Sequence, residues 1–213
     1  MKLSTRNSPP DQPDIVFQIE AEGADLARWV IDYFEARVRD GTRFHNNETV
    51  QLGWGLLLLR QNGDVLEVFE PDFKSMPIQW CPGVNHTIRH LHLQRSVCDL
   101  FNCDPMFPSL LQAGIVSPRF TESRDYTMSR DNAEDPDSGW LFAETGYPGP
   151  EAEFCSLYQL GVQKPEIVPF LALPVSSHIA IGPGRCEITV DSVVKSAAGC
   201  EVLHRLMASC GLS

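Results

Sequence analysis

Acidic side chains are concentrated in one stretch of the chain, residues 131–153 (DNAEDPDSGWLFAETGYPGPEAE), which contains no Lys or Arg. Its seven carboxylates are Asp131, Glu134, Asp135, Asp137, Glu144, Glu151 and Glu153. Carboxylates at this density can be solvated surface, can ligate a hard cation such as Ca²⁺, or can dock on a cationic partner. These three alternatives define the functional question for this sequence.

The calcium alternative fails the spacing test for an EF-hand loop. Counted from Asp131, such a loop needs Asp or Asn at its third and fifth positions and Gly at its sixth. The sequence has Ala133, Asp135 and Pro136 there. Loose calcium binding by the acidic stretch stays open, but the spacing predicts no dedicated site.

Two histidines have a spacing that zinc sites on helices use. His86 and His90 are four residues apart, so a helix would carry both on one face. A zinc-protease motif places Glu directly after the first His, whereas this chain has Thr87. We therefore predict no metal, no cofactor, and surface or half-buried histidines.

Motifs for catalysis are missing from the sequence. It has no G-x-S-x-G elbow, no Walker loop and no G-x-G-x-x-G. An activated cysteine needs an electropositive environment, which a chain of net charge −11 supplies poorly. Cys81 or Cys98, beside the basic segment 86–95, is the remaining candidate, and we predict no catalytic residue.

Charge and composition narrow the class of partner. A net charge of −11 over 213 residues argues against nucleic acid, because phosphate binding needs clustered Lys and Arg. It also disfavours anionic membranes, and the longest apolar run, Leu56–Leu59, is too short to span a bilayer. Seven scattered cysteines without a C-x-x-C pair are typical of a reduced, cytoplasmic protein.

Unopposed carboxylates repel one another, which gains a fold nothing. They become useful when a cationic surface approaches, because they then accelerate association. On this argument a docking surface and a plain solubilising surface both stay open.

Periodicity predicts an α+β fold of two packed halves that position these residues. The predicted regions are a flexible tail (1–14), an N-terminal α+β region (15–108), a smaller α+β domain (109–191) and a C-terminal helix (192–213). The predicted strands are 15–19, 50–60, 65–70, 111–117, 140–143, 177–181 and 186–190, with a hairpin turn at Asn62-Gly63. The predicted helical segments are 24–38, 85–102, 154–162, 165–171 and 192–209.

Short motifs in the second half carry a family likeness. They are Gly114-Ile115-Val116-Ser117, Met128-Ser129-Arg130, Ser138-Gly139-Trp140-Leu141-Phe142 (an S-G-W-x-F core), Ser156-Leu157-Tyr158-Gln159-Leu160 and Pro165–Leu171 followed by Leu173-Pro174. In this order and spacing, residues 111–184 resemble a bacterial immunity-protein family, formerly a domain of unknown function, found beside polymorphic toxin genes. The N-terminal 110 residues are additional to that domain.

The resemblance implies a cytoplasmic protein that binds one cognate toxin of a polymorphic system, such as a type VI secretion effector, and occludes it without chemistry. With the charge argument, it predicts a toxin that has a basic surface. The predicted partner-binding residues are Asp131, Glu134, Asp135, Asp137, Trp140, Glu144, Tyr147, Glu151 and Glu153; Trp140 alternatively belongs to the core. Two rivals remain, a small-molecule or regulatory module with a pocket near Trp80 and His86, and a Cys- or His-dependent enzyme.

Overall fold

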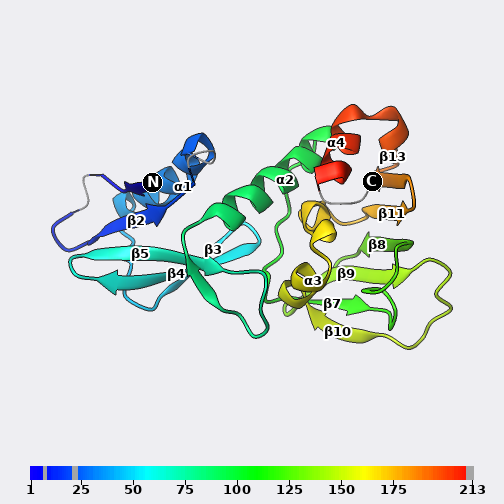
Figure 1. Ribbon diagram of the computed structural model, residues 1–213, viewed down its shortest axis with the longest axis horizontal. Helices are drawn as coiled ribbons and strands as arrows, with labels where there is room; N and C mark the ends of the chain where they lie inside the picture. The colour runs from blue at the N-terminus through cyan, green and yellow to red at the C-terminus, as the bar shows by residue number, and fades with distance from the viewer. Residues whose placement is uncertain (7–8, 21–23, 210–213) are drawn as a thin grey trace. The chain divides into compact units, whose positions relative to one another are not determined.

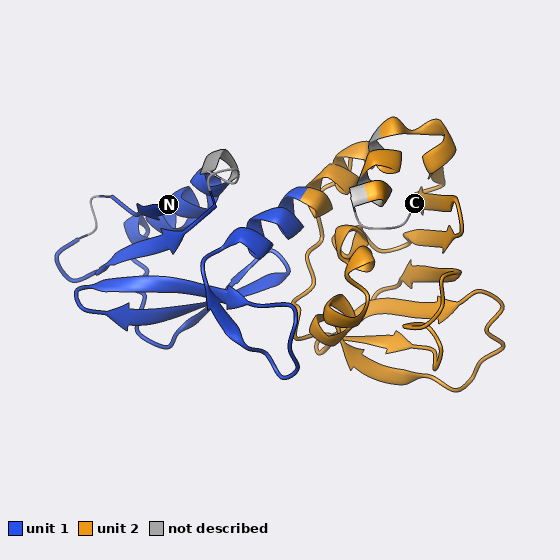
Figure 2. Ribbon diagram, viewed as in Figure 1, with its two compact units in different colours: residues 1–92 blue, residues 93–213 orange. Residues whose placement is uncertain are grey.

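The computed structural model describes residues 1–6, 9–20 and 24–209, and its fold is α+β as the sequence predicts. The chain forms two compact units, unit 1 (Met1–His92) and unit 2 (Leu93–Ser213), which Figure 2 shows in blue and orange. One helix, α2 (Asn85–Phe101), begins in unit 1 and ends in unit 2 (Figure 1). The division at His92 thus precedes the Pro105 and Pro108 pair where the sequence predicts it.

Unit 1 contains one mixed sheet, in the order β1-β2-β5-β4-β3 with β6 beside β5. Its strands are β1 (Lys2–Ser4), β2 (Asp14–Gln18), β3 (Thr49–Leu52), β4 (Gly55–Asn62), β5 (Val65–Pro71) and β6 (Trp80–Pro82). β4 has a neighbour on each side and buries Leu57, Leu58 and Leu59, as predicted for a central strand. Gly53, at a φ of 59°, turns the predicted strand 50–60 into two strands.

Helix α1 (Ala24–Arg39) supplies the apolar cover of unit 1. Its buried Phe34 packs edge-on against Phe17 of β2, with ring centroids 5.4 Å apart, and against Phe44 at 5.0 Å. The helix ends before Gly41, whose φ of 96° favours glycine, as the sequence predicts. The side chain of Leu26, predicted on the same face, lies outside the described part of the chain.

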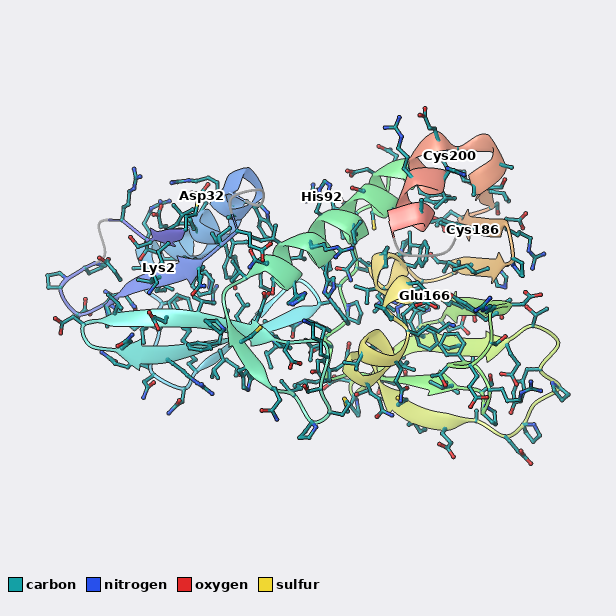
Figure 3. All side chains as sticks on the ribbon, viewed as in Figure 1. Lys2, Asp32, His92, Glu166, Cys186 and Cys200 are labelled. Carbon is teal, nitrogen blue, oxygen red and sulfur yellow. The ribbon has the colours of Figure 1, made fainter. Side chains whose placement is uncertain are left out.

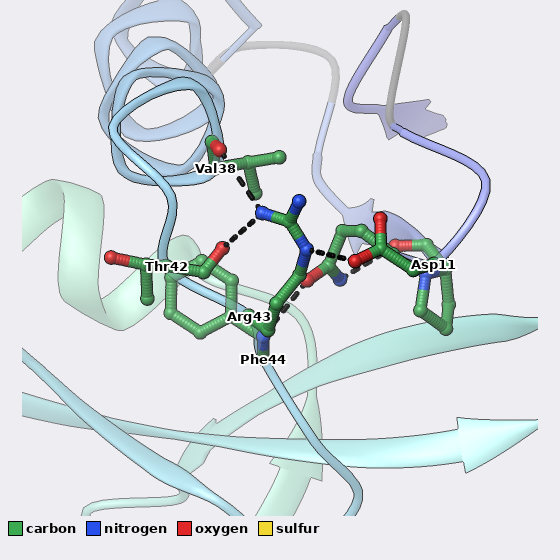
Figure 4. A network of polar contacts seen from close by, with 7 residues as sticks. Asp11, Val38, Thr42, Arg43 and Phe44 are labelled. Carbon is green, nitrogen blue, oxygen red and sulfur yellow. Dashed lines mark hydrogen bonds and ion pairs between the residues drawn. The ribbon is translucent and has the colours of Figure 1, made fainter.

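The segment before β2 has a place in the fold, where the sequence predicts a flexible tail over residues 1–14. β1 pairs with β2. Figure 4 shows Arg43 Nε donating to Asp11 Oδ2 at 2.8 Å, and Phe44 N donates to the side chain of Gln12 at 2.8 Å. These partners are distant in sequence, so the proline-rich composition of the segment gives no sign of them.

Unit 2 contains a seven-stranded sheet in the order β10-β7-β9-β8-β11-β12-β13. Its strands are β7 (Ala113–Val116), β8 (Tyr126–Arg130), β9 (Asp137–Glu144), β10 (Glu153–Ser156), β11 (His178–Gly182), β12 (Arg185–Val190) and β13 (Val193–Ser196). Only the β7–β9 pair is parallel among these strands. The sequence predicts β7, β9, β11 and β12 but not β8, β10 or β13.

One face of this sheet forms the core of unit 2. Trp140 and Phe142 of β9 and Met128 of β8 are fully buried on it. The helical segments packed in unit 2 are residues 93–101 of α2, α3 (Leu157–Gln163) and the 3₁₀ helix η2 (Pro165–Phe170). Gln94 Nε2, on α2, donates to Val168 O of η2 at 3.1 Å and so ties two of these segments together.

Two predicted helices begin as strands. The first four residues of the segment predicted as helix 154–162 include part of β10, and α3 starts only at Leu157, capped by the Ser156 hydroxyl. The predicted terminal helix over 192–209 contains β13, a 3₁₀ turn η3 (Ala197–Gly199) and α4 (Glu201–Ser209). Val193 and Val194 are β-branched and gain a ladder with β12, which overrides the helical pattern.

The described cysteines are free thiols, spread over both units. Cys186 of β12 is buried, and Cys200 precedes α4 (Figure 3). Cys210 lies outside the described residues. Within the described chain, no helix is both long and apolar enough to cross a bilayer.

A β-bulge interrupts β9 at Ser138-Gly139-Trp140. Between the register pairs Ala113–Asp137 and Ile115–Leu141, two steps along β7 correspond to four along β9. Gly139 has a φ of 77°, and a Cβ there would lie 2.1 Å from the carbonyl oxygen of Asp131. Only glycine therefore fits this position of the bulge.

We expect Gly139→Ala to destabilise unit 2 severely. Gly146→Ala is the matched control, because Gly146 has the same φ of 77° but nothing within 4 Å of an added Cβ. The control should lose about 1–2 kcal/mol for its backbone conformation alone. Gly139→Ala should lose about 2 kcal/mol more, because the clash is with backbone.

Urea unfolding followed by circular dichroism measures both variants. Equal midpoints for the two substitutions would contradict a steric requirement at Gly139.

Candidate functional site

Strand β9 divides the acidic stretch into two separate groups. Asp131, Glu134 and Asp135 lie in the loop between β8 and β9, and Asp137 opens β9. We call residues 131–137 the acidic loop. Glu144 closes β9, and its seven steps from Asp137 correspond to roughly 23 Å at about 3.3 Å per residue. Glu153 pairs with Val116 at this second end of the sheet, so the nine predicted residues do not form one cluster.

The acidic loop is held by its backbone. Asp131 N donates to Gly139 O, Asp137 N to Glu134 O, and Ala113 N to Pro136 O, each at 2.9 Å. The side chains of Asp131, Glu134 and Asp135 are exposed, and no ion pair among the described residues includes them. Three carboxylates without an internal cation leave this loop with an uncompensated negative field.

Two carboxylates at the loop have local structural roles. Asp137 Oδ1 accepts a hydrogen bond from Gly139 N at 2.9 Å, which supports the bulge. Asp135 Oδ1 accepts one from Gln112 Nε2 at 3.1 Å, which attaches the loop to the segment before β7. Next to Gln112, Leu111 is 56% exposed, so an apolar side chain adjoins the acidic loop.

The acidic residues at the other end of β9 have a mixed environment. The Ser117 hydroxyl donates to Glu144. Although partial burial alone would raise it, the pKa of Glu144 is lowered by this bond, by backbone N–H groups and by the charge of Arg119. Glu151 and Glu153 are exposed.

Tyr147 is half-buried at the same end. Desolvation and the charges of Glu151 and Glu144 raise the pKa of its phenol. A neighbouring arginine and a mixed set of roles make this end less uniformly negative than the acidic loop.

Trp140 belongs to the core, so its prediction as a partner contact is wrong for this conformation. Its side chain is fully buried, and its Nε1 donates to Leu171 O at 3.1 Å. Arg130 stands opposite it in the β8–β9 register, with the guanidinium 5.6 Å from the indole centroid. A strand places successive residues on opposite faces, and position 140 falls on the buried one.

Arg130 is 7% exposed and donates to the backbone. Its Nη1 lies 2.6 Å from both Met106 O and Leu173 O, beyond the end of η2. Burial lowers the pKa of Arg130 to about 10, so the group stays charged at neutral pH. The pair Arg130 and Trp140 thus fixes the turn at 171–173 against the sheet.

The other signature residues meet at the same place. Ser138 Oγ donates to Ala113 O at 2.7 Å and so joins β9 to β7. A Cβ at Gly114 would lie 2.6 Å from the ring of Phe142, so β7 can approach this ring only with glycine there. The motifs that carried the family likeness are therefore packing residues, whereas the exposed chemistry lies in the acidic loop.

The opposite face of the sheet in unit 2 is open. Register pairs give one row across all seven strands, because paired residues point to the same face. The row is Phe154, Ile115, Leu141, Ser129, His178, Thr189 and Val194. Its β10–β7–β9 end is apolar: Phe154 is 72% exposed and Leu141 40% exposed, with half-buried Ile115 between them. We call Phe154, Ile115 and Leu141 the apolar row.

Sequence reasoning missed the apolar row because it placed Phe154 in a helix and treated Leu141 as part of a buried island. The available signal was the alternation of β9, where Trp140 and Phe142 are buried and Leu141 between them is not. Which of two alternating sets faces water depends on what covers the sheet, and that comes from distant segments.

Unit 1 holds a second group of chemical side chains that the sequence did not bring together. Glu70 and Cys81 are register partners on β5 and β6, and His86 is the second residue of α2. One ligand atom from each of these three side chains lies within 4.8 Å of the other two. This is where the structure puts His86, which the sequence linked to a ligand pocket with half-exposed Trp80.

The thiols of the candidate nucleophiles are not activated. Burial raises the pKa of Cys81, and the charges of Glu70 and Asp72 add to this effect. Burial likewise raises the pKa of Cys98 to about 12. A catalytic thiolate needs the opposite, an electropositive setting.

Comparison with known families assigns unit 2. Residues 93–191 match the family model of the Imm33-like domain, which confirms the resemblance to an immunity-protein family and extends it to the second half of α2. No curated protein and no solved structure matches the chain. The acidic loop, the apolar row, Arg130 and Trp140 all lie within the matched residues.

We expect Arg130→Met to cost unit 2 about 2–4 kcal/mol, because it leaves the buried carbonyls of Met106 and Leu173 without donors. Arg124→Met, at an exposed position, is the control and should change the unfolding free energy by no more than about 0.5 kcal/mol. Chemical denaturation of both variants measures the difference. A loss in Arg130→Met as small as that of the control would show that the guanidinium does not hold the turn.

Proposed function

We propose that this chain, whose residues 93–191 form an Imm33-like domain, is an immunity protein that binds and neutralises one cognate bacterial toxin. The observation that carries the proposal is that the matched domain presents an exposed acidic loop without internal cations close to an exposed apolar row. An apolar centre with a charged rim is the usual composition of a specific protein interface.

The size of this surface suits one protein partner. The two acidic groups lie at opposite ends of β9, roughly 23 Å apart at about 3.3 Å per residue, and the apolar row lies between them. A standard interface covers about 800 Å² of each partner, a patch roughly 30 Å across. One toxin surface can therefore contact the acidic loop and the apolar row together.

The charge of the loop favours a toxin with a basic surface. Asp131, Glu134 and Asp135 are exposed and unpaired, so a cationic partner would gain their field without first breaking ion pairs. Such a field raises association rates and weakens with salt. Nuclease toxins fit this description, because they must hold phosphates.

Neutralisation by occlusion needs no chemistry from the immunity protein. The raised pKa values of Cys81 and Cys98 agree with a binding role. We propose that the protein acts in the cytoplasm of the producing cell, and that its partner is the toxin and not nucleic acid or membrane.

The proposal is tested by expressing the product of the neighbouring gene with and without this chain. The expected result is that the neighbouring product arrests growth, that co-expression restores growth, and that the two purified proteins form a complex. A toxic neighbour that neither binds the chain nor is relieved by it would overturn the proposal.

We expect the triple variant Asp131→Lys, Glu134→Lys, Asp135→Lys to lose at least about tenfold in affinity for the toxin, mostly through slower association. Asp137 is left intact because it supports the bulge. The control variant Glu20→Lys, Asp40→Lys, Asp64→Lys makes the same change in net charge at exposed positions of unit 1. It should keep its affinity; equal losses in both variants would assign the effect to total charge and not to the loop.

A second substitution addresses the apolar row. Phe154→Ala should weaken toxin binding by at least about tenfold, since truncating a central aromatic side chain costs about 1–2 kcal/mol or more. Its effect on stability should be within about 0.5 kcal/mol, because the side chain is 72% exposed. Val194→Ala, at the opposite edge of the same face and 56% exposed, is the control. Calorimetry on both variants measures the affinity, and unchanged binding by Phe154→Ala would exclude this row from the interface.

A further inference from the structure

We propose that Glu70, Cys81 and His86 of unit 1 bind a zinc ion. This site is independent of the proposed toxin interface, because all three residues precede the Imm33-like domain. The sequence predicted no metal, since the spacing of its histidines matches no zinc motif. The structure brings together three side chains from three elements instead, and their ligand atoms lie within 4.8 Å of one another.

The fold holds these side chains in place. Glu70 and Cys81 face each other across the β5–β6 ladder, so their side chains lie on one side of the sheet. The backbone N–H groups of His86 and Thr87, in the first turn of α2, donate to the two carboxylate oxygens of Glu70 at 2.9 and 2.7 Å. These bonds set the position of His86 relative to the carboxylate.

Glu70 is a buried charge in need of compensation. The residue is 1% exposed, and none of the ion pairs found in the described chain includes it. The two N–H groups and the helix dipole offset part of the cost of burial. Each carboxylate oxygen keeps a further lone pair, which a cation can use.

The donor set selects the metal. One imidazole nitrogen, one thiolate sulfur and one carboxylate oxygen suit Zn²⁺, whereas Ca²⁺ and Mg²⁺ prefer oxygen ligands alone. Bonds of about 2.0–2.3 Å put tetrahedral ligand atoms about 3.5 Å apart, so the side chains need to close by about 1 Å. Cys81 and His86 are half-buried, which leaves a path to solvent and a fourth position for water. On binding, the thiol of Cys81 gives its proton to solvent.

An aromatic wall borders the site. Phe73 lies against His86, with ring centroids 5.9 Å apart, and against His90 at 4.7 Å. The buried Trp54 stacks on Phe73 at 5.5 Å. This wall limits the orientations of the His86 ring and lowers the local dielectric, which strengthens binding of a cation to the carboxylate.

Titration of the chelator-treated full chain with Co²⁺ and Zn²⁺ tests the site. We expect one saturable equivalent of Co²⁺ with a thiolate-to-cobalt charge-transfer band, and displacement of Co²⁺ by Zn²⁺. Cys81→Ser should abolish the band, and His86→Ala should weaken Zn²⁺ binding by at least about tenfold. Cys103→Ser and His45→Ala, which change a half-buried thiol and an exposed imidazole elsewhere, should behave as the unmodified chain.

A measurement on the unmodified chain guards against misfolded variants. Zn²⁺ should slow alkylation of Cys81 at least about tenfold, as read by mass spectrometry, and should leave Cys103 unaffected. Cobalt binding without a charge-transfer band, no saturable equivalent, or equal protection of both cysteines would overturn the proposal. Glu70 would then serve only to stabilise the start of α2.

Discussion

The structure of unit 2 depends on one buried cation that has no buried anion as its partner. Arg130 inserts its guanidinium between the sheet and the turn at 171–173, where backbone carbonyls accept its hydrogen bonds and the indole of Trp140 lies beside it. Carbonyl groups at the end of a helical segment carry partial negative charge, which suits a guanidinium. The cost of burying the charge is offset because the same contacts satisfy carbonyls that would otherwise be orphaned.

The bulge in β9 follows from this constraint. Trp140 must reach Leu171 O, Ser138 must reach Ala113 O, and Gly139 must allow the chain of Asp131 to pass. Small and polar residues therefore precede the tryptophan for steric reasons and not for contact with a partner. This explains how a short motif can identify the domain while its side chains stay inside.

Much of the fold could be predicted from local pattern, because several elements are specified by their own residues. Helix α1 has a helical stripe and a glycine stop, and Asn62-Gly63 specifies the β4–β5 turn. Strands β1, β10 and β13 could not be predicted in this way, since each is short and exists only through a distant or neighbouring strand. The candidate site was predicted in part: the exposure of Asp131, Glu134 and Asp135 follows from their charge, but the strand that separates them from Glu151 and Glu153 does not.

The acidic loop is anchored through main-chain atoms, at Asp131 N, Asp137 N and Pro136 O. The identities of the side chains at 131 and 134 are consequently almost free of the folding requirement. Such a loop is an exchangeable recognition segment on a constant frame. A descendant of this protein could change its adversary by a few substitutions there, while the tryptophan, the arginine and the glycine behind them continue to specify the same domain.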